Sequence, residues 1–323
     1  MCYAAQIKAD FRKFTREYGA VMSLRQFFEL FWHKRKDQEW QKLPKAMRMA
    51  FAQAGSGSDE EREFAALIAA GDREQANVLE AELFRQKSRL AEAERALAGR
   101  PTRKAENEQR IAADKIARLQ QNLADLQRAV LAPEDAMIFP GYYAPVMIMM
   151  DGRRVIVPMR YRCRLPGWDV AMERKKPGTY NARRDNLETA WRQLFGYRHG
   201  ILPIRAFHEH VARHRLERRE LGPDEKEQSV VLEFRPEPPQ DLLIACLWSL
   251  HQGEAGEPDL YSFAAITDEP PPEVAAAGHD RCVIPIKPQH VDAWLNPDPG
   301  NLAALHAILE DRERPFFEYR LAA

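Results

Sequence analysis

The chain has 323 residues, enough to bury a large core as one large domain or as two smaller ones. Lys plus Arg and Asp plus Glu both number 48, so the net charge of zero favours no class of partner. No apolar stretch is long enough to span a membrane, and charged residues from Lys8 to Lys13 interrupt any signal peptide. We therefore expect a cytoplasmic protein with no membrane contact.

The first feature along the chain is a cysteine at position two. Removal of Met1 would expose an N-terminal Cys2, whose α-amine and thiol stand on adjacent carbons. Such an aminothiol condenses with an aldehyde, first as an imine and then as a thiazolidine ring. Usual pKa values of about 8 for the amine and about 8.5 for the thiol leave both nucleophiles available near neutral pH. Taken alone, a cysteine at this position is better explained as an arbitrary residue, and the interpretation depends on segments further along the chain. Cys163 and Cys246 are expected to be small buried hydrophobic residues, and no CxxC pair is present, as in a reducing compartment.

Residues 11–53 mix aromatic and basic side chains. The spacing of Leu24, Phe27, Phe28, Phe31 and Trp32 predicts an amphipathic helix. Aromatic and basic residues together can stack the bases of nucleic acid, although core packing is the favoured use here.

A helical hairpin is predicted over residues 72–131. Apolar residues recur every three or four positions on both sides of Gly99 to Thr102, where Gly and Pro end one helix and start another. Each arm would be about 40 Å long at 1.5 Å per residue. Gly55 to Ser58 marks a break before it, and Ser58 with Glu61 forms a capping-box pattern. The hairpin has few residues that could do chemistry, so it is expected to be an appended arm.

From Phe139 onwards the pattern changes to strands. Strands 146–150 and 155–159 flank Asp151-Gly152, a dipeptide typical of type I′ hairpin turns. Further strands are expected at 200–204, 229–235, 241–248, 261–266 and 283–286. Helices alternate with them too rarely for a doubly wound sheet. The predicted fold class is therefore α+β, with a mostly antiparallel, partly closed sheet, flanking helices and the inserted helical hairpin.

Charge is unevenly distributed over this second half. Residues 153–219 hold 17 basic and 6 acidic residues, whereas residues 220–280 hold 14 acidic and 2 basic ones. Such asymmetry suits an anionic ligand on one side of the fold, and it is equally consistent with two oppositely charged solvated faces.

Several short segments, taken in order, resemble the SOS response-associated peptidase family, whose members crosslink themselves to abasic sites in single-stranded DNA. They are Met1-Cys2, Tyr142 to Pro145, Met159 to Tyr161 with Leu165 to Trp168, Tyr180 to Arg183 with Glu188-Thr189, Leu202-Pro203 with Ala206 to Glu209, Phe263 to Thr267, His279 to Arg281 and Ala293 to Leu295. The resemblance covers Met1-Cys2 and about 139–297, and leaves the hairpin as an insertion. The chain departs from the family pattern in several places. Tyr3 and Ala4 replace the glycine and arginine that follow its N-terminal cysteine, His208 and His210 replace the residues that flank its glutamate, Cys282-Val283 replace the residues that follow its His-Asp-Arg, and Asp185 to Leu187 are three extra residues.

The resemblance implies roles for individual residues. Cys2 would be the nucleophile, Asn181 would position the N-terminus, and Glu209 and His279 would transfer protons. The chemistry itself requires proton donors and acceptors, because the sugar ring must open and an oxygen must leave as water. The resemblance and the basic run around it implicate Arg183 in phosphate binding. We include its basic neighbours Arg184, Arg160 and Arg162 in the expected DNA contact. No cofactor and no metal are expected.

Two other functions remain open at this level. His208, Glu209, His210 and His214 could form the site of a metal-dependent hydrolase, with His210 and His214 on one face if the segment is helical. The chain could instead be a non-catalytic interaction protein that uses the hairpin as a docking arm for a protein partner. For the domains, we expect 1–54 and 136–323 to form the catalytic core around an inserted segment, 55–135.

Overall fold

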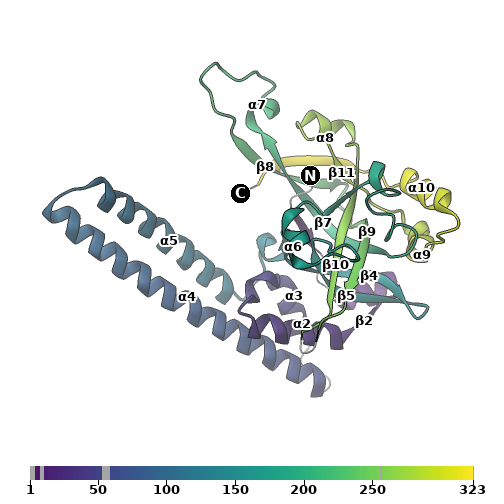
Figure 1. Cartoon of the computed structure of the whole chain (residues 1–323), viewed down its shortest axis with the longest axis horizontal. Coiled ribbons are helices and arrows are strands. Elements are labelled where there is room, and N and C mark those ends of the chain that lie inside the picture. The colour runs from purple at the N-terminus through teal and green to yellow at the C-terminus, as the bar shows by residue number, and fades with distance from the viewer. Residues whose placement is uncertain (1–3, 8–10, 53–58, 255–256, 323) are drawn as a thin grey trace. The chain divides into compact units, whose positions relative to one another are not determined.

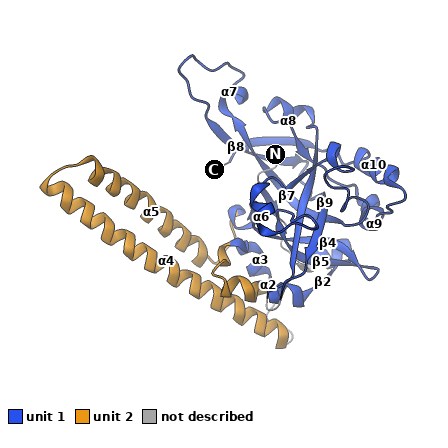
Figure 2. Cartoon of the chain, in the orientation of Figure 1, with its two compact units in different colours: residues 1–30, 42–50, 133–323 blue, residues 31–41, 51–132 orange. Residues whose placement is uncertain are grey.

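A computed structural model describes residues 4–7, 11–52, 59–254 and 257–322 (Figure 1). The chain forms two compact units, one of residues 1–30, 42–50 and 133–323, the other of residues 31–41 and 51–132 (Figure 2). We call them the β-rich unit and the helical unit. Whether 55–135 is a separable functional domain, as the sequence suggests, stays a prediction.

The β-rich unit is built on one large, mostly antiparallel sheet. Its strands are β1 (Ala4–Ile7), β2 (Val21–Met22), β3 (Met137–Ile138), β4 (Tyr143–Met150), β5 (Arg153–Tyr161), β6 (Asn181–Arg183), β7 (His199–Ala212), β8 (Ser229–Glu237), β9 (Leu242–His251), β10 (Leu260–Asp268), β11 (Cys282–Val283) and β12 (Phe316–Leu321). β4, β5, β10, β9 and β7 pair in sequence, and β7 pairs again with β4, so these strands close on themselves. The predicted α+β class with a partly closed sheet is confirmed.

The turn between β4 and β5 follows from two residues. Asp151 and Gly152 have φ angles of +50° and +72°, the left-handed conformations that a type I′ turn requires at both central positions. The strands then pair from Met150 with Arg153 to Tyr143 with Arg160. The predicted hairpin is confirmed, whereas the strand expected at 283–286 ends after Val283. Pro285 has no N–H to donate to a sheet, and it makes only an isolated bridge with Ile244.

Apolar side chains from the inner face of the sheet form the core of the β-rich unit. They include Val146, Ile148, Val157, Phe207, Phe234 and Phe263, each less than 1% exposed. The short helices of this unit are α1 (Phe11–Tyr18), α3 (Lys45–Ala52, shared with the helical unit), α6 (Val170–Lys175), α7 (Arg213–Leu216), α8 (Pro272–Ala276), α9 (Val291–Leu295) and α10 (Leu302–Glu310).

The helical unit contains the predicted hairpin, formed by α4 (Asp59–Gly99) and α5 (Arg103–Gln127). The Thr102 hydroxyl accepts a hydrogen bond from the Ala105 N–H and so caps α5. Buried alanines line the seam between the two helices: Ala93, Ala105 and Ala112. The hairpin is confirmed, and α4 begins at Asp59, thirteen residues before the expected hairpin but at the point where the capping-box pattern predicts that a helix opens. Ser58 of the proposed capping box lies outside the described residues.

The early start of α4 has a packing reason. Its first turns bury Phe64, Leu67 and Ile68, and the Phe64 ring lies 5.0 Å from that of Phe31, in the amphipathic helix α2 (Leu24–Lys36). Phe31 also makes an edge contact with Trp40, with ring centroids 5.7 Å apart. An aromatic cluster thus joins the root of α4 to α2. The periodicity of the hairpin alone could not indicate this cluster.

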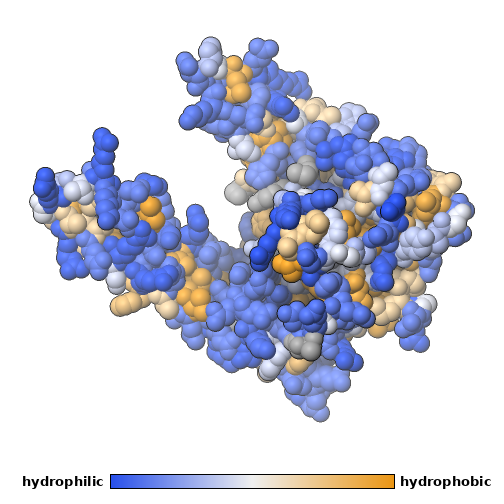
Figure 3. Space-filling model, viewed as in Figure 1, coloured by the Kyte–Doolittle hydropathy of each residue, from blue (hydrophilic) through white to orange (hydrophobic). Residues whose placement is uncertain are grey.

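The outer surface is mainly polar. The face drawn in Figure 3 is predominantly hydrophilic, with apolar residues in small separate patches. No helix in the described part of the chain is both long and apolar enough to cross a membrane.

Candidate active site

Glu209 is the most deeply buried ionisable residue of the expected site. Its side chain is fully enclosed, on the strand β7. A bulge precedes it, because Gln6 pairs with Ala206 whereas Ile7 pairs with Ile204, which leaves Arg205 as an extra residue. A bulge shifts the alternation of side chains along a strand. Core residues therefore change from Leu202 and Ile204 to Phe207 and Val211, and Glu209 shares this inward face.

His279 meets Glu209 in this interior. Its Nε2 atom lies 3.2 Å from the Glu209 Oε2 atom, and the two side chains are 7% and 0% exposed. Gly278 makes the approach feasible, since it has φ +96° and a Cβ there would lie 2.9 Å from the Val211 side chain. His279 follows α8 and precedes β11, so it reaches Glu209 from a segment seventy residues further along the chain.

The protonation of this pair follows from its hydrogen bonds. His279 Nδ1 lies 2.8 Å from the Arg281 carbonyl oxygen and 3.3 Å from the Arg281 N–H. The shorter contact is to a group that only accepts, so Nδ1 carries a proton. Burial lowers the pKa of His279, although the Arg281 carbonyl partly opposes this effect. Neutral His279 then turns its Nε2 lone pair towards the Glu209 carboxyl group. Such a pair can accept or donate a proton in a reaction.

The first described strand runs beside this pair. β1 is antiparallel to β7, and Ala4 pairs with His208, the neighbour of Glu209. Cys2, the expected nucleophile, lies outside the described residues.

The other three cysteines offer no competing nucleophile. Cys163, Cys246 and Cys282 are buried and form no disulfide. Burial raises the pKa of all three thiols, that of Cys163 to about 12. A thiol reacts as its thiolate, so these cysteines are unreactive near neutral pH. The prediction that Cys163 and Cys246 are buried hydrophobic residues is confirmed.

Asn181 occupies a neighbouring strand. It is buried on β6, where it pairs with Ala265 of β10, and β10 goes on to pair with β11 just after His279. Tyr161 donates a hydrogen bond of 3.3 Å from its hydroxyl to the Asn181 Oδ1 atom. The Tyr161 ring stacks on Phe263, with centroids 5.1 Å apart. The orientation of the Asn181 amide is thus fixed by an aromatic residue that the sequence reading did not single out.

Arg160 and Arg162, two of the expected DNA contacts, share one acidic partner. The buried Glu173 carboxylate accepts from Arg160 at 2.6 Å and from Arg164 at 2.8 Å, and Arg162 Nε lies 3.5 Å from it. Three guanidinium groups therefore surround one carboxylate and leave an excess of positive charge. Arg162 has φ +149°, a strained conformation for a residue with a side chain, and its guanidinium also donates to the Glu173 carbonyl oxygen. The sequence did not lead us to predict roles for Glu173 and Arg164. The alternation of arginines around Arg162 could have indicated that Arg164 belongs to the same cluster.

Arg183 and Arg184 have different surroundings despite being adjacent. Arg183 has a 44% exposed side chain and an ion pair of 2.9 Å with Asp185, itself exposed. Arg184 is half-buried and bridges Asp268 at 2.9 Å and Glu310 at 2.7 Å. Of the two, Arg183 is the one with free surface for a ligand.

The histidine cluster does not support a metal site. Residues 199–212 form a strand rather than a helix, so His208 and His210 project to the face opposite Glu209. His214 lies beyond the strand in α7, where it faces Glu227 at 3.9 Å. Within the described residues, no three His, Cys, Asp or Glu side chains are grouped to hold a metal ion. The metal-dependent hydrolase hypothesis was wrong because sheet pairing with β8 determined the conformation of this segment.

The chain matches the model of a known protein family. This model, described as SOS response associated peptidase (SRAP), covers residues 98–320. A search of curated proteins gave no match.

Three solved structures are similar to the chain. A protein from Bordetella bronchiseptica has a TM-score of 0.45 and 20% identity, covering 64% of this chain and 95% of its own. A phage-related protein from the same bacterium has a TM-score of 0.42 and 18% identity, covering 61% and 85%. A protein from Bacteroides thetaiotaomicron has a TM-score of 0.44 and 13% identity, covering 58% and 78%.

Proposed function

Because the chain belongs to the SOS response associated peptidase family, we propose that it removes its own Met1 and crosslinks through Cys2 to abasic sites in single-stranded DNA. Family membership supports a function associated with DNA damage. The crosslink protects the abasic site during the response to that damage. The observation that carries the proposal is the buried pair of His279 and Glu209, the latter on the strand that pairs with β1.

The covalent link between Cys2 and β1 supports Cys2 as the proposed nucleophile. Two peptide units separate Cys2 from Ala4, and they span at most about 7 Å. Ala4 pairs with His208, so Cys2 is tethered within a short reach of Glu209. With the other three thiols buried, Cys2 is the cysteine left for the reaction.

The reaction balances with one water released. An abasic sugar in its open form presents an aldehyde, whose carbon accepts the lone pair of the Cys2 amine. The aldehyde oxygen takes protons and leaves as water, which gives an imine. The Cys2 thiol then adds to the imine carbon, its proton passes to the nitrogen, and a thiazolidine ring results.

The buried pair supplies the proton transfers that these steps require. Glu209 takes a proton from the ammonium form of Cys2, and His279 handles the proton of the ring oxygen as the sugar opens. Asn181 orients the N-terminus through its amide and adds no charge. For the removal of Met1, Glu209 activates the water that cleaves the first peptide bond.

The basic segment provides the attraction for DNA. Glu173 fixes Arg160 and Arg162 in place while their side chains keep 18% and 27% exposure. Three arginines against one glutamate give this cluster an excess of positive charge that suits phosphate groups. Arg183 has the most exposed side chain of the four proposed contacts. It makes the outermost phosphate contact.

Intact-mass spectrometry tests the proposal directly. Purified protein should lack Met1, and incubation with abasic single-stranded DNA should add the mass of the strand minus one water. Cys2→Ser keeps the amine, so it should form only an imine, which needs a reductant to survive a denaturing gel. Cys246→Ala is the control and should crosslink like the wild type.

Two outcomes would overturn the proposal. One is recovery of Met1 on most molecules of an active preparation. The other is a stable crosslink formed by the Cys2→Ser variant without reductant. An intact Met1 combined with no aldehyde reactivity would instead favour the non-catalytic interaction protein.

A further inference from the structure

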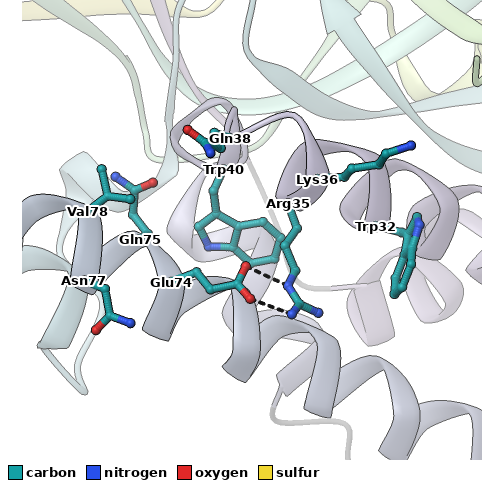
Figure 4. Close-up of a pocket in the computed structure, with 10 residues that line it drawn as sticks. Trp32, Arg35, Lys36, Gln38, Trp40, Glu74, Gln75, Asn77 and Val78 are labelled. Atoms are coloured by element: carbon teal, nitrogen blue, oxygen red, sulfur yellow. Dashed lines mark hydrogen bonds and ion pairs between the residues drawn. The ribbon is translucent and has the colours of Figure 1, made fainter.

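The helical unit contains a cavity that the proposed chemistry does not use. It has a volume of about 530 Å³ and lies between the end of α2, the segment around Trp40 and α4 (Figure 4). Binding sites for small ligands usually have volumes of about 300–1,000 Å³. Its lining includes two tryptophans, Trp32 and Trp40, and the amide side chains Gln38, Gln75 and Asn77.

The two tryptophans differ in their surroundings. Trp40 is 2% exposed, its indole N–H donates to Asp72 at 2.8 Å, and Gly71 lies against its ring. A Cβ at Gly71 would come within 2.5 Å of that ring, so only glycine permits this packing. Trp32 is 51% exposed, although it directly follows the buried Phe31 on the same helix. One indole is therefore a fixed wall, and the other presents its ring to solvent.

Two basic side chains line the cavity, and one of them, Lys36, is available to bind a ligand. Arg35 donates to both Glu74 oxygens, at 2.8 and 2.6 Å, and this ion pair lies beside the Trp40 ring in Figure 4. Lys36 is exposed, and no acidic partner within 4 Å is found for it among the described residues. Lys36 follows Trp32 by four residues on α2, so both residues share one face of the helix.

We infer that this cavity binds a nucleotide of single-stranded nucleic acid, with a base stacked on Trp32 and the adjoining phosphate bound by Lys36. The amide side chains can both donate to and accept from the edge of a base. The lining suits an apolar partner helix poorly, because Val78 is its one aliphatic side chain. The inference relies on the proposed function only for the class of ligand, and it adds a second contact outside the active site.

The experiment measures binding of the full chain to intact oligothymidine, which has no aldehyde and cannot crosslink. Stacking on an aromatic residue is worth about 1–3 kcal/mol per base, so Trp32→Ala should weaken binding by roughly 5- to 150-fold. Trp32→Phe keeps a ring and should recover most of the affinity. Phe84→Ala is the matched control, because Phe84 is 75% exposed on the same unit and does not line the cavity.

Lysine variants test the phosphate contact. Lys36→Gln should reduce the slope of log affinity against log salt by about 0.7, the value for one phosphate on a single strand. Lys87→Gln, an exposed lysine elsewhere on α4, should leave the slope unchanged.

The outcomes separate this inference from the proposed function. Trp32→Ala should still crosslink to short abasic strands, because those strands need only the active site. If the wild type failed to crosslink while Trp32→Ala still lost affinity for intact strands, the proposed function would fall and the stacking site would stand. Wild-type affinity in the Trp32→Ala variant would overturn the stacking site, and so would a wild type that does not bind intact strands. The stacking site would also be overturned if an acidic peptide, but not oligothymidine, competed for the cavity. That result would assign the cavity to a protein ligand.

Discussion

Two buried glutamates of the β-rich unit have opposite electrostatic surroundings. Glu209 faces His279, a partner that can gain or lose a proton, whereas Glu173 is surrounded by three arginines whose charge does not change. A carboxylate beside a histidine can exchange a proton at low cost. A carboxylate among guanidinium groups cannot, and it serves to hold those groups in position. Burial of a glutamate alone therefore does not identify a catalytic residue, and its partners decide the function.

The largest expected effect concerns the chemistry at Glu209. Glu209→Gln keeps the size of the side chain but cannot take a proton, so removal of Met1 and crosslinking should slow by about 10²- to 10⁴-fold. Single-turnover crosslinking followed on denaturing gels would measure this rate. The melting temperature serves as the control and should change little. A rate within a factor of two of the wild type would show that the two glutamates do not differ as described.

The next effect concerns stability at Glu173. Glu173→Ala leaves three arginines close together without their shared carboxylate, and we expect a loss of about 3 kcal/mol in the free energy of unfolding. Urea denaturation would measure it. Glu217→Ala removes a half-exposed carboxylate that pairs with Arg219, and it should cost less than about 1 kcal/mol. Equal losses in the two variants would mean that the cluster is only another surface network.

A third prediction uses the pH dependence of stability. Burial lowers the pKa of His279 in the folded protein, so below its usual pKa of about 6.5 the unfolded chain binds a proton that the folded chain does not. Stability should therefore fall as the pH falls below that value. His279→Gln should reduce this slope by at most about 1.4 kcal/mol per pH unit.

A control variant and a second buried histidine define how much of the pH slope belongs to His279. Arg162→Gln, in the Glu173 cluster, should leave the slope unchanged because an arginine does not titrate in this range. The slope should not vanish in His279→Gln, since burial also lowers the pKa of His199 to about 3. An identical pH profile for His279→Gln and the wild type would contradict the buried pair.

The smallest effect is expected at Arg183. Arg183→Ala removes one exposed charge, so the salt slope of binding to intact single-stranded DNA should fall by about 0.7 while stability changes little. Titrations at several salt concentrations would measure the slope. Arg110→Ala removes an arginine of α5 that is still more exposed, at 67%, and should leave the slope as it is. Should Arg183→Ala bind like the wild type, the phosphate contacts would have to lie with the clustered arginines alone.

Features that depend on a few neighbouring residues could be predicted from the sequence. Asp151-Gly152 specified a turn whose positive φ angles few other dipeptides adopt, and the structure has that turn. The repeat of apolar residues specified the α4–α5 hairpin, because side chains three and four positions apart share one face of a helix. The pairing of Glu209 with His279 was expected only through family resemblance, since seventy residues separate them.

Other features depended on contacts between distant segments. The metal-site hypothesis placed His210 and His214 on one face of a helix, but residues up to Ala212 pair with β8 as a strand and His214 lies beyond it in α7. The basic run around Arg162 predicted positive charge, but only the fold brought Glu173 into its centre.

The sequence by itself thus determined the local elements, the α+β class and the family of this protein. The tertiary structure alone decided which face of β7 carries Glu209 and which arginines are held by an acidic partner. The reason is physical: backbone angles and side-chain periodicity act over a few residues, whereas burial and charge pairing depend on what packs opposite. A charged residue keeps the same identity in either setting, and only its neighbours in space make it a proton carrier or an anchor.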